Sequence, residues 1–171
     1  MIIGSYGMFW ERDLVDWSAR PWRLLGRRGY NAGTLKVADF RRARGVYILY
    51  NEINVYYVGL ASSTNGIGGR LKDHLSDEHE WGWNRFSWFA FDSPEDAGEE
   101  QADGVIKVTQ QYGAIELDTP ILIRDLEALL QAATQPLGNR SVTKFQEGDE
   151  WLQVATRKPE VQSFEDLSSR L

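Results

Sequence analysis

Residues 45–74 read GVYILYNEINVYYVGLASSTNGIGGRLKDH, and this stretch decides the fold. Its first half alternates as the strand of a hairpin does, with Val46, Ile48 and Tyr50 on one face and Tyr47 and Leu49 on the other. Residues 51–54 turn the chain, and a second strand returns beside the first. The stretch therefore predicts an antiparallel hairpin rich in tyrosine.

A short helix is predicted directly after the glycine-rich loop, beginning at Gly66. Arg70 and His74 are four residues apart, so a helix places them on one face. Together with Tyr47 and Tyr57 of the hairpin, they bring two phenols, a guanidinium and an imidazole close together.

Two tyrosine-glycine triads frame the hairpin. Gly45-Val46-Tyr47 is followed, after nine residues, by Tyr57-Val58-Gly59. With Arg70 and His74 on the following helix, this pattern resembles the signature of the GIY-YIG nucleases. The resemblance covers about residues 44–140 and implies an α/β (α+β) fold, a small three-stranded antiparallel sheet flanked by helices.

The resemblance also implies a role for each of these side chains. Tyr47 is the general base for the attacking water, and His74 relays its proton, because a free phenol with a pKa of about 10 is a poor base at neutral pH. Arg70 stabilises the charge of the phosphate, and Tyr57 orients water or phosphate.

A later helix, expected to start at Thr119-Pro120, carries Glu127 on a partly apolar stripe, so its side chain is expected to point inward. By itself, this residue is either a functional carboxylate or a rim carboxylate paired to a base. Asn139, by itself, is a cap or turn residue. The resemblance implies that Glu127 binds one divalent metal, Mg²⁺ or Mn²⁺, and that Asn139 completes the catalytic set.

The sequence predicts two further elements, a strand and a helix. Residues 85–91, RFSWFAF, predict a buried third strand at the centre of the sheet. Ser93-Pro94 is typical of a helix start, and the helix is expected to run to about Tyr112. Residues 1–43 are expected to form a basic aromatic arm, and residues 141–171 a C-terminal extension that packs on the domain.

Charge divides the chain into unequal parts. The net charge is −6, yet residues 1–72 hold 11 Lys/Arg against 5 Asp/Glu, whereas residues 73–171 hold 8 against 20. The basic part is either a solvated surface or a surface that faces phosphates. The residues expected to bind nucleic acid are Arg41, Arg42, Arg44, Lys72, Gly68 and Gly69. The alternative role of the two glycines is to permit a tight entry to the helix.

Several classes of site are excluded by composition. The chain has 171 residues, no cysteine and 2 histidines, so disulfides and thiolate zinc sites are absent. The loop SSTNGIGG lacks the Gly-Lys-Ser/Thr ending of a P-loop, which argues against a nucleotide cofactor. With no long apolar run and no signal-like start, a cytoplasmic protein without a membrane segment is expected.

The sequence thus predicts a metal-dependent endonuclease that hydrolyses DNA phosphodiester bonds. The alternative is a catalytically weak or inactive module of the GIY-YIG fold that binds nucleic acid or a protein partner. The sequence departs from the family's pattern at a second histidine that would take part in proton transfer. His79 lies earlier than that position, and Trp83 occupies the region where some members carry the histidine.

Overall fold

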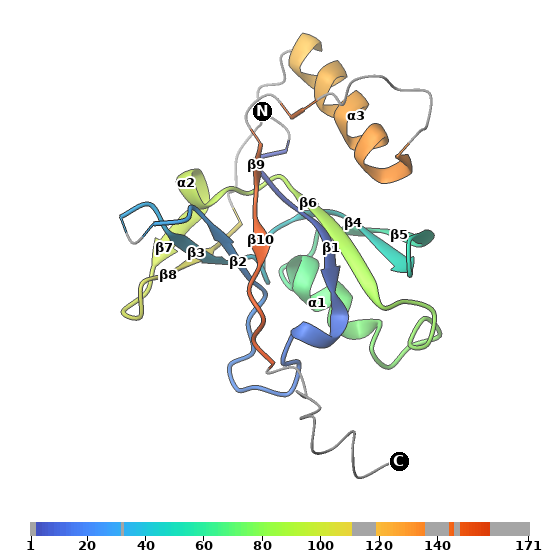
Figure 1. The fold of residues 1–171 in the computed structure, drawn as a ribbon, viewed down its shortest axis with the longest axis horizontal. Coiled ribbons are helices and arrows are strands. Elements are labelled where there is room, and N and C mark those ends of the chain that lie inside the picture. The colour runs from blue at the N-terminus through green and yellow to red at the C-terminus, as the bar shows by residue number, and fades with distance from the viewer. Residues whose placement is uncertain (1–2, 32, 111–118, 136–143, 146–147, 158–171) are drawn as a thin grey trace, which may run out of the picture.

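The computed structural model describes residues 3–31, 33–110, 119–135, 144–145 and 148–157. Over these residues the chain forms two five-stranded sheets (Figure 1). Sheet A contains, in spatial order, β5 (Asn54–Ala61), β4 (Gly45–Asn51), β6 (Arg85–Ala90), β1 (Ser5–Glu11) and β9 (Asp149–Glu150). Sheet B contains, in spatial order, β10 (Leu152–Gln153), β2 (Leu25–Arg28), β3 (Lys36–Asp39), β8 (Val105–Val108) and β7 (Gly98–Glu100).

The helices are short apart from one. They are the 3-10 turn η1 (Arg12–Leu14) and the α-helices α1 (Gly66–Asp73), α2 (Pro94–Ala97) and α3 (Thr119–Thr134). In the part of the chain that the structure describes, none of them is long and apolar enough to cross a membrane.

The predicted fold class, a small three-stranded sheet flanked by helices, was wrong. β5, β4 and β6 do pair antiparallel in that order, but the sheet continues through β1 and β9. A second sheet forms from strands of two to four residues, which are too short to show a period in the sequence. The protein is therefore a mixed α+β fold that consists mostly of strands.

Alternation along β4 separates two hydrophobic clusters on the two faces of sheet A. Tyr47 and Leu49 pack in one cluster with Leu71 of α1. Ile48 packs in the other cluster with Ala128 of α3. The helices α1 and α3 accordingly lie on opposite faces of sheet A, as Figure 1 shows. The alternation predicted from the hairpin sequence is confirmed.

Aromatic packing joins the two sheets. Phe40, which follows β3, lies 4.4 Å from Trp88 of β6 and 5.1 Å from Trp151, measured between ring centroids. Trp151 stands between β9 and β10, so the segment 149–153 contributes one strand to each sheet. The hydrophobic cluster that contains Tyr47 thus extends into sheet B.

Other predicted elements have mixed outcomes. β6 is the third strand of five in sheet A, which confirms its predicted central position. α2 starts as predicted, since the Ser93 hydroxyl accepts a hydrogen bond from the Asp96 N–H, but the helix ends at Ala97 instead of near Tyr112. A Cβ on Gly98 would lie 2.1 Å from the Pro94 carbonyl oxygen, and β8 pairs instead with β3 and β7.

The segments expected outside the domain lie partly within the sheets. Residues 1–43 contribute β1 to sheet A and β2 and β3 to sheet B. Residues 149–153 contribute β9 and β10.

Candidate active site

Three side chains, joined in series by two hydrogen bonds, connect the hairpin to the residues that follow α1. The Tyr47 hydroxyl lies 2.8 Å from His74 Nε2, and His74 Nδ1 lies 2.6 Å from Asp77 Oδ2. An ionised carboxylate only accepts hydrogen bonds, so Nδ1 carries a proton, and in the neutral form of the ring Nε2 accepts a hydrogen bond from Tyr47. The carboxylate thereby fixes the tautomer that can receive a proton from the phenol.

The surroundings of Asp77 favour its ionised form. Burial acts to raise the pKa of Asp77, but hydrogen bonds from the His79 backbone N–H and from the His74 ring outweigh it, and the pKa of Asp77 is lowered. The His79 backbone N–H donates to Asp77 Oδ1 over 2.8 Å, while His74 occupies the other oxygen. Both oxygens of Asp77 are therefore engaged in orienting the site.

The phenol at the other end is buried. Tyr47 is 0% exposed, and burial raises the pKa of Tyr47 to about 12, although the Arg70 guanidinium acts in the opposite direction. Tyr57 and Arg70 both interact with the Tyr47 hydroxyl. A phenol in this environment stays neutral at ordinary pH, so it can accept a proton only by passing its own to His74.

The second histidine joins the same group. The His79 ring lies 4.6 Å from the Tyr57 ring and 5.0 Å from the His74 ring, measured between centroids. Its Nδ1 is 3.3 Å from the Tyr56 hydroxyl. The loop after α1 folds back here, so His79 lies beside the tyrosines although the sequence places it early.

Glycines at both triads make room for this arrangement. A Cβ on Gly59 would lie 2.2 Å from the Tyr47 hydroxyl oxygen, and a Cβ on Gly45 would lie 2.0 Å from the Phe89 carbonyl oxygen. Because real Cβ atoms do not approach so closely, only glycine allows the Tyr47 ring to lie across β5 and β4 to lie against β6.

The start of α1 is fixed against the segment 41–43. The N–H groups of Ile67 and Gly68 donate to the carbonyl oxygens of Ala43 and Arg41, over 2.8 and 2.9 Å. A Cβ on Gly68 would lie 2.8 Å from Arg41 Cα. Gly68, expected to contact nucleic acid, is thus buried against the protein backbone, which supports the alternative role of a tight entry to the helix.

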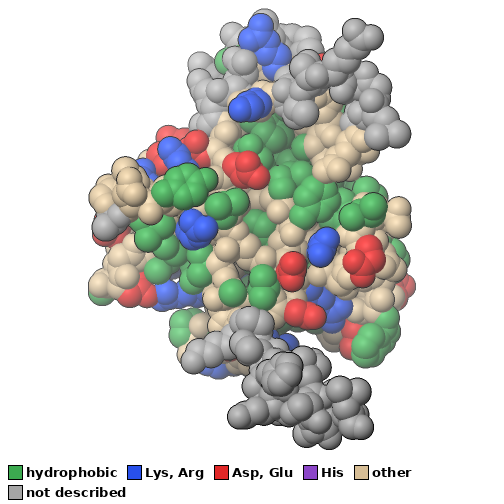
Figure 2. Space-filling view, viewed as in Figure 1, with side chains coloured by type: hydrophobic (Ala, Val, Ile, Leu, Met, Phe, Trp, Pro, Cys, Tyr) green, Lys and Arg blue, Asp and Glu red, His purple; other side chains and the backbone are tan. Residues whose placement is uncertain are grey.

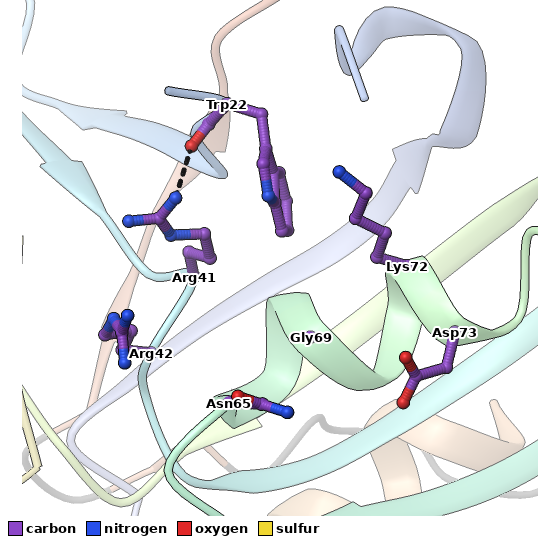
Figure 3. A pocket seen from close by; sticks show the side chains of 7 residues that line it. All are labelled: Trp22, Arg41, Arg42, Asn65, Gly69, Lys72 and Asp73. Carbon is purple, nitrogen blue, oxygen red and sulfur yellow. Dashed lines mark hydrogen bonds between the residues drawn. The ribbon is translucent and has the colours of Figure 1, made fainter. Parts of the chain in front are cut away.

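Four of the residues expected to bind nucleic acid line one hollow beside α1. Arg41, Arg42 and Lys72 surround a hollow of about 250 Å³, with Gly69 in its wall (Figure 3). Arg44 lies apart from these residues, since its guanidinium makes two hydrogen bonds, of 2.7 and 3.1 Å, with the buried carboxylate of Asp92. On the face drawn in Figure 2, acidic and basic side chains are interspersed. The unequal distribution of charge along the sequence therefore does not make that face uniformly basic.

Glu127 lies away from the tyrosines. It is exposed, and its Oε1 accepts a hydrogen bond of 3.1 Å from Gln131 Nε2, so the expected inward direction was wrong. The buried residues of α3 include Asp125 and Ala128, which turn Glu127 outward. Because α3 packs on the face opposite α1, the structure does not bring Glu127 together with Tyr47. Asn139 lies outside the described residues.

The donor atoms near Tyr47 do not match the ligands expected for Mg²⁺. His74, Asp77 and His79 offer three ligand atoms within 4.8 Å of one another, but this set contains two imidazoles, whereas Mg²⁺ prefers oxygen ligands. Both ring nitrogens of His74 are also occupied by hydrogen bonds. Neither this cluster nor Glu127 on the far face of sheet A fits a magnesium site beside Tyr47.

Comparisons with protein-family models, with curated proteins and with solved structures find no match to this chain. The resemblance of the two triads therefore remains a prediction. Asp77 is the residue of the cluster that the sequence interpretation missed, and its signal was the spacing of three residues after His74.

Proposed function

We propose that the chain is an endonuclease that hydrolyses DNA phosphodiester bonds, with Tyr47 and His74 as its proton-transfer pair. The observation that carries this proposal is the connected series Tyr47–His74–Asp77 with Arg70 beside the phenol. The resemblance of the two triads to the GIY-YIG nucleases supports the same reaction class.

Each step follows from one of these groups. Water attacks the phosphorus, its proton passes to the Tyr47 oxygen, and the phenolic proton passes to His74 Nε2. The imidazolium that forms is stabilised by ionised Asp77, as in other carboxylate-oriented histidines. The bond to the 3′ oxygen breaks, which leaves a 5′ phosphate, and the leaving oxygen takes a proton from solvent.

Arg70 is the group that meets the substrate first. Its side chain is 40% exposed, whereas Tyr47 is 0% exposed. Besides Tyr47, it pairs with Asp73, at 3.4 Å between Nη1 and Oδ2, a contact that a negatively charged backbone phosphate can replace. The proposed reaction requires that Arg70 move toward the phosphate and open the Tyr47 hydroxyl to the attacking water.

Whether nicking depends on a divalent metal is a separate question that the assay answers. The residues around Tyr47 do not form a magnesium site, so none of the steps above passes through an ion. If Glu127 holds the metal, as the resemblance implies, Glu127→Ala abolishes stimulation by Mg²⁺ or Mn²⁺. A variant with the metal dependence of the wild type shows that Glu127 is not the ligand.

Plasmid nicking tests the proposal directly. The wild-type chain, Arg70→Ala and Arg85→Ala are compared in Mg²⁺, in Mn²⁺ and in EDTA. Arg85 is a matched control, since its side chain is 38% exposed and pairs with Glu11, as that of Arg70 pairs with Asp73. Arg70→Ala is expected to lose about 10²–10³ in rate, the usual effect of removing one group that stabilises transition-state charge, and Arg85→Ala to retain the wild-type rate. Equal rates for all three proteins refute the assignment.

The second candidate is a DNA-binding module without turnover. The observation that favours it is the outward position of Glu127 on α3, away from the tyrosines. Salt-sensitive DNA binding by the wild-type chain, without nicking in any of these metals, supports this candidate over the nuclease.

A further inference from the structure

The basic hollow beside α1 continues into a second hollow on sheet B. The first, of about 250 Å³, is lined by Arg41, Arg42 and Lys72 among others, and the second, of about 330 Å³, by the same two arginines with Lys107. Lys107 lies on β8, far along the chain from α1. Of the residues that line the two hollows, four are basic and Asp73 is acidic.

The cations of the first hollow are held in place by the protein. Arg41 Nη1 donates to the Trp22 carbonyl oxygen over 2.9 Å, and Lys72 Nζ donates to the Trp17 carbonyl oxygen over 3.0 Å. Figure 3 shows the Trp22 indole between Arg41 and Lys72, and both cations lie over its ring, at 5.4 and 4.9 Å from the centroid. Cations fixed in this way lose little side-chain entropy when an anion binds.

These cations retain capacity for a ligand. A guanidinium has five N–H donors, and neutral carbonyl oxygens do not cancel its charge. Among the described residues, Arg41, Arg42 and Lys72 each donate to a carbonyl oxygen, in the case of Arg42 from Nη1 to that of Thr64 over 3.2 Å. Arg41 and Lys72 also lie over the Trp22 indole ring. The pKa of Lys72 is lowered, by burial first and then by the positive charges of Arg20 and Arg41.

The second hollow is built by a contact between distant segments. Gln110, which follows β8, donates through Nε2 to the carbonyl oxygens of Arg42 and Ser63, over 3.1 and 2.7 Å. This side chain ties sheet B to the loop before α1, so that Lys107 and Arg42 face one hollow. The sequence did not predict that Lys107 binds nucleic acid.

The first hollow also adjoins the candidate active site. Asp73 lines it and pairs with Arg70, which in turn interacts with Tyr47. A chain of phosphates that has one member at Arg70 can therefore pass beside Asp73 into the hollow at Lys72 and Arg41.

We propose that the two hollows bind successive backbone phosphates of the DNA strand being cut, with Arg41, Arg42 and Lys72 at the nearer phosphate and Lys107 at the farther one. This inference rests on the proposed nuclease function for the identity of the strand. It adds that substrate binding extends across sheet B, so that a DNA strand ending close to the scissile bond binds weakly.

The test is the salt dependence of DNA binding, measured separately from cleavage. Fluorescence anisotropy of a labelled 20-base-pair duplex, a length chosen to exceed about one helical turn, is followed in EDTA as salt increases. The proteins compared are wild type, Arg42→Gln, Lys107→Gln and Lys144→Gln. Lys144 is exposed and lies outside both hollows, so it serves as the control.

Removal of one phosphate contact lowers the slope of log K against log salt by about 1 and weakens binding to all sequences alike. This result is expected for Arg42→Gln and Lys107→Gln, whereas Lys144→Gln keeps the wild-type slope. A wild-type slope in both hollow variants overturns the inference, and so does a wild-type chain that binds no DNA. If the wild-type chain nicks plasmid but the hollow variants bind normally, the nuclease function stands and the inference falls. If the slopes change but no nicking occurs, DNA binding at the two hollows stands and the nuclease function falls.

Discussion

Tyr47 and Tyr50 are two buried tyrosines on one strand that face opposite sides of sheet A, and they have different surroundings. Tyr47 is 0% exposed and meets a histidine, an arginine and a second tyrosine. Tyr50 is 1% exposed and packs with Ile48, Phe89 and the aromatic ring of Phe9. Burial of a tyrosine on β4 therefore does not by itself mark a site, whereas convergence of titratable groups on its hydroxyl does.

The largest expected effect is the loss of cleavage in Tyr47→Phe. Removing the hydroxyl removes the acceptor of the water proton, which is typically worth about 10²–10⁴ in rate. Tyr50→Phe makes the same chemical change on the other face of the sheet and is expected to cut plasmid at the wild-type rate. Initial nicking rates, with circular dichroism to confirm folding, make the comparison. Equal losses in the two variants would mean that the Tyr47 face has no special role.

A second difference between the faces is the space that glycine leaves for Tyr47. Gly59→Ala places a methyl group 2.2 Å from the Tyr47 hydroxyl oxygen, so either the ring or β5 must move. Overpacking of this kind costs about 1–3 kcal/mol of stability and should also displace the phenol from His74. Urea unfolding measures the first effect and nicking the second.

Gly33→Ala is the control for this substitution, because a Cβ on Gly33 has nothing within 4 Å. Its stability is expected to stay within about 0.5 kcal/mol of the wild type. A Gly59→Ala protein of wild-type stability and activity would show that the Tyr47 ring does not need its present position.

The sequence predicted the proximity of four side chains better than the sheet around them. The two triads and the i, i+4 pair were enough to bring Tyr47, Tyr57, Arg70 and His74 near one another, because a hairpin and a helix are local structures. Asp77 was missed because its contact with His74 depends on the turn after α1. Sheet B was missed because strands such as Leu152–Gln153 have no readable period and pair with residues far along the chain.

The position of Glu127 illustrates a different difficulty. Its helix was predicted correctly as an element, but the side of sheet A on which a helix packs depends on the whole core. Likewise, Ser93-Pro94 started α2 as predicted, whereas pairing of Val105–Val108 with β3 decided that the helix would not continue. Local chemistry fixes where a helix begins more reliably than where it ends or packs.

A smaller loss of activity is expected for Asp77→Asn. The amide can donate to His74 Nδ1 and favour the tautomer in which Nε2 carries the proton, which cannot accept one from Tyr47. Because the tyrosine and histidine remain, we expect a loss of about 10- to 100-fold in nicking rate, comparable to the effect of other partners that orient a ligand or base.

Glu78→Gln is the matched control, since Glu78 is a neighbouring acid whose side chain is 86% exposed and lies 3.7 Å from His79. A merely structural role for Asp77 predicts lower stability at an unchanged pH–rate profile. The positioning role predicts near wild-type stability with a changed profile, which nicking rates measured across pH distinguish.

The last prediction concerns stability at high pH, which both tyrosines are expected to lower. The pKa of Tyr47 is raised to about 12 from 10.0, so its contribution is fully present below pH 10 and is lost as pH rises toward 12. In this window the free energy of unfolding falls by up to about 1.4 kcal/mol per pH unit for one such group. Tyr47→Phe removes this dependence, and urea unfolding at a series of pH values measures the difference in slope.

Since the pKa of Tyr50 is also raised by burial, Tyr50→Phe should flatten the curve of stability against pH in the same direction without loss of nicking. The two faces of β4 are thus expected to share the cost of ionising a buried phenol, whereas the proton path to His74 belongs to one face only.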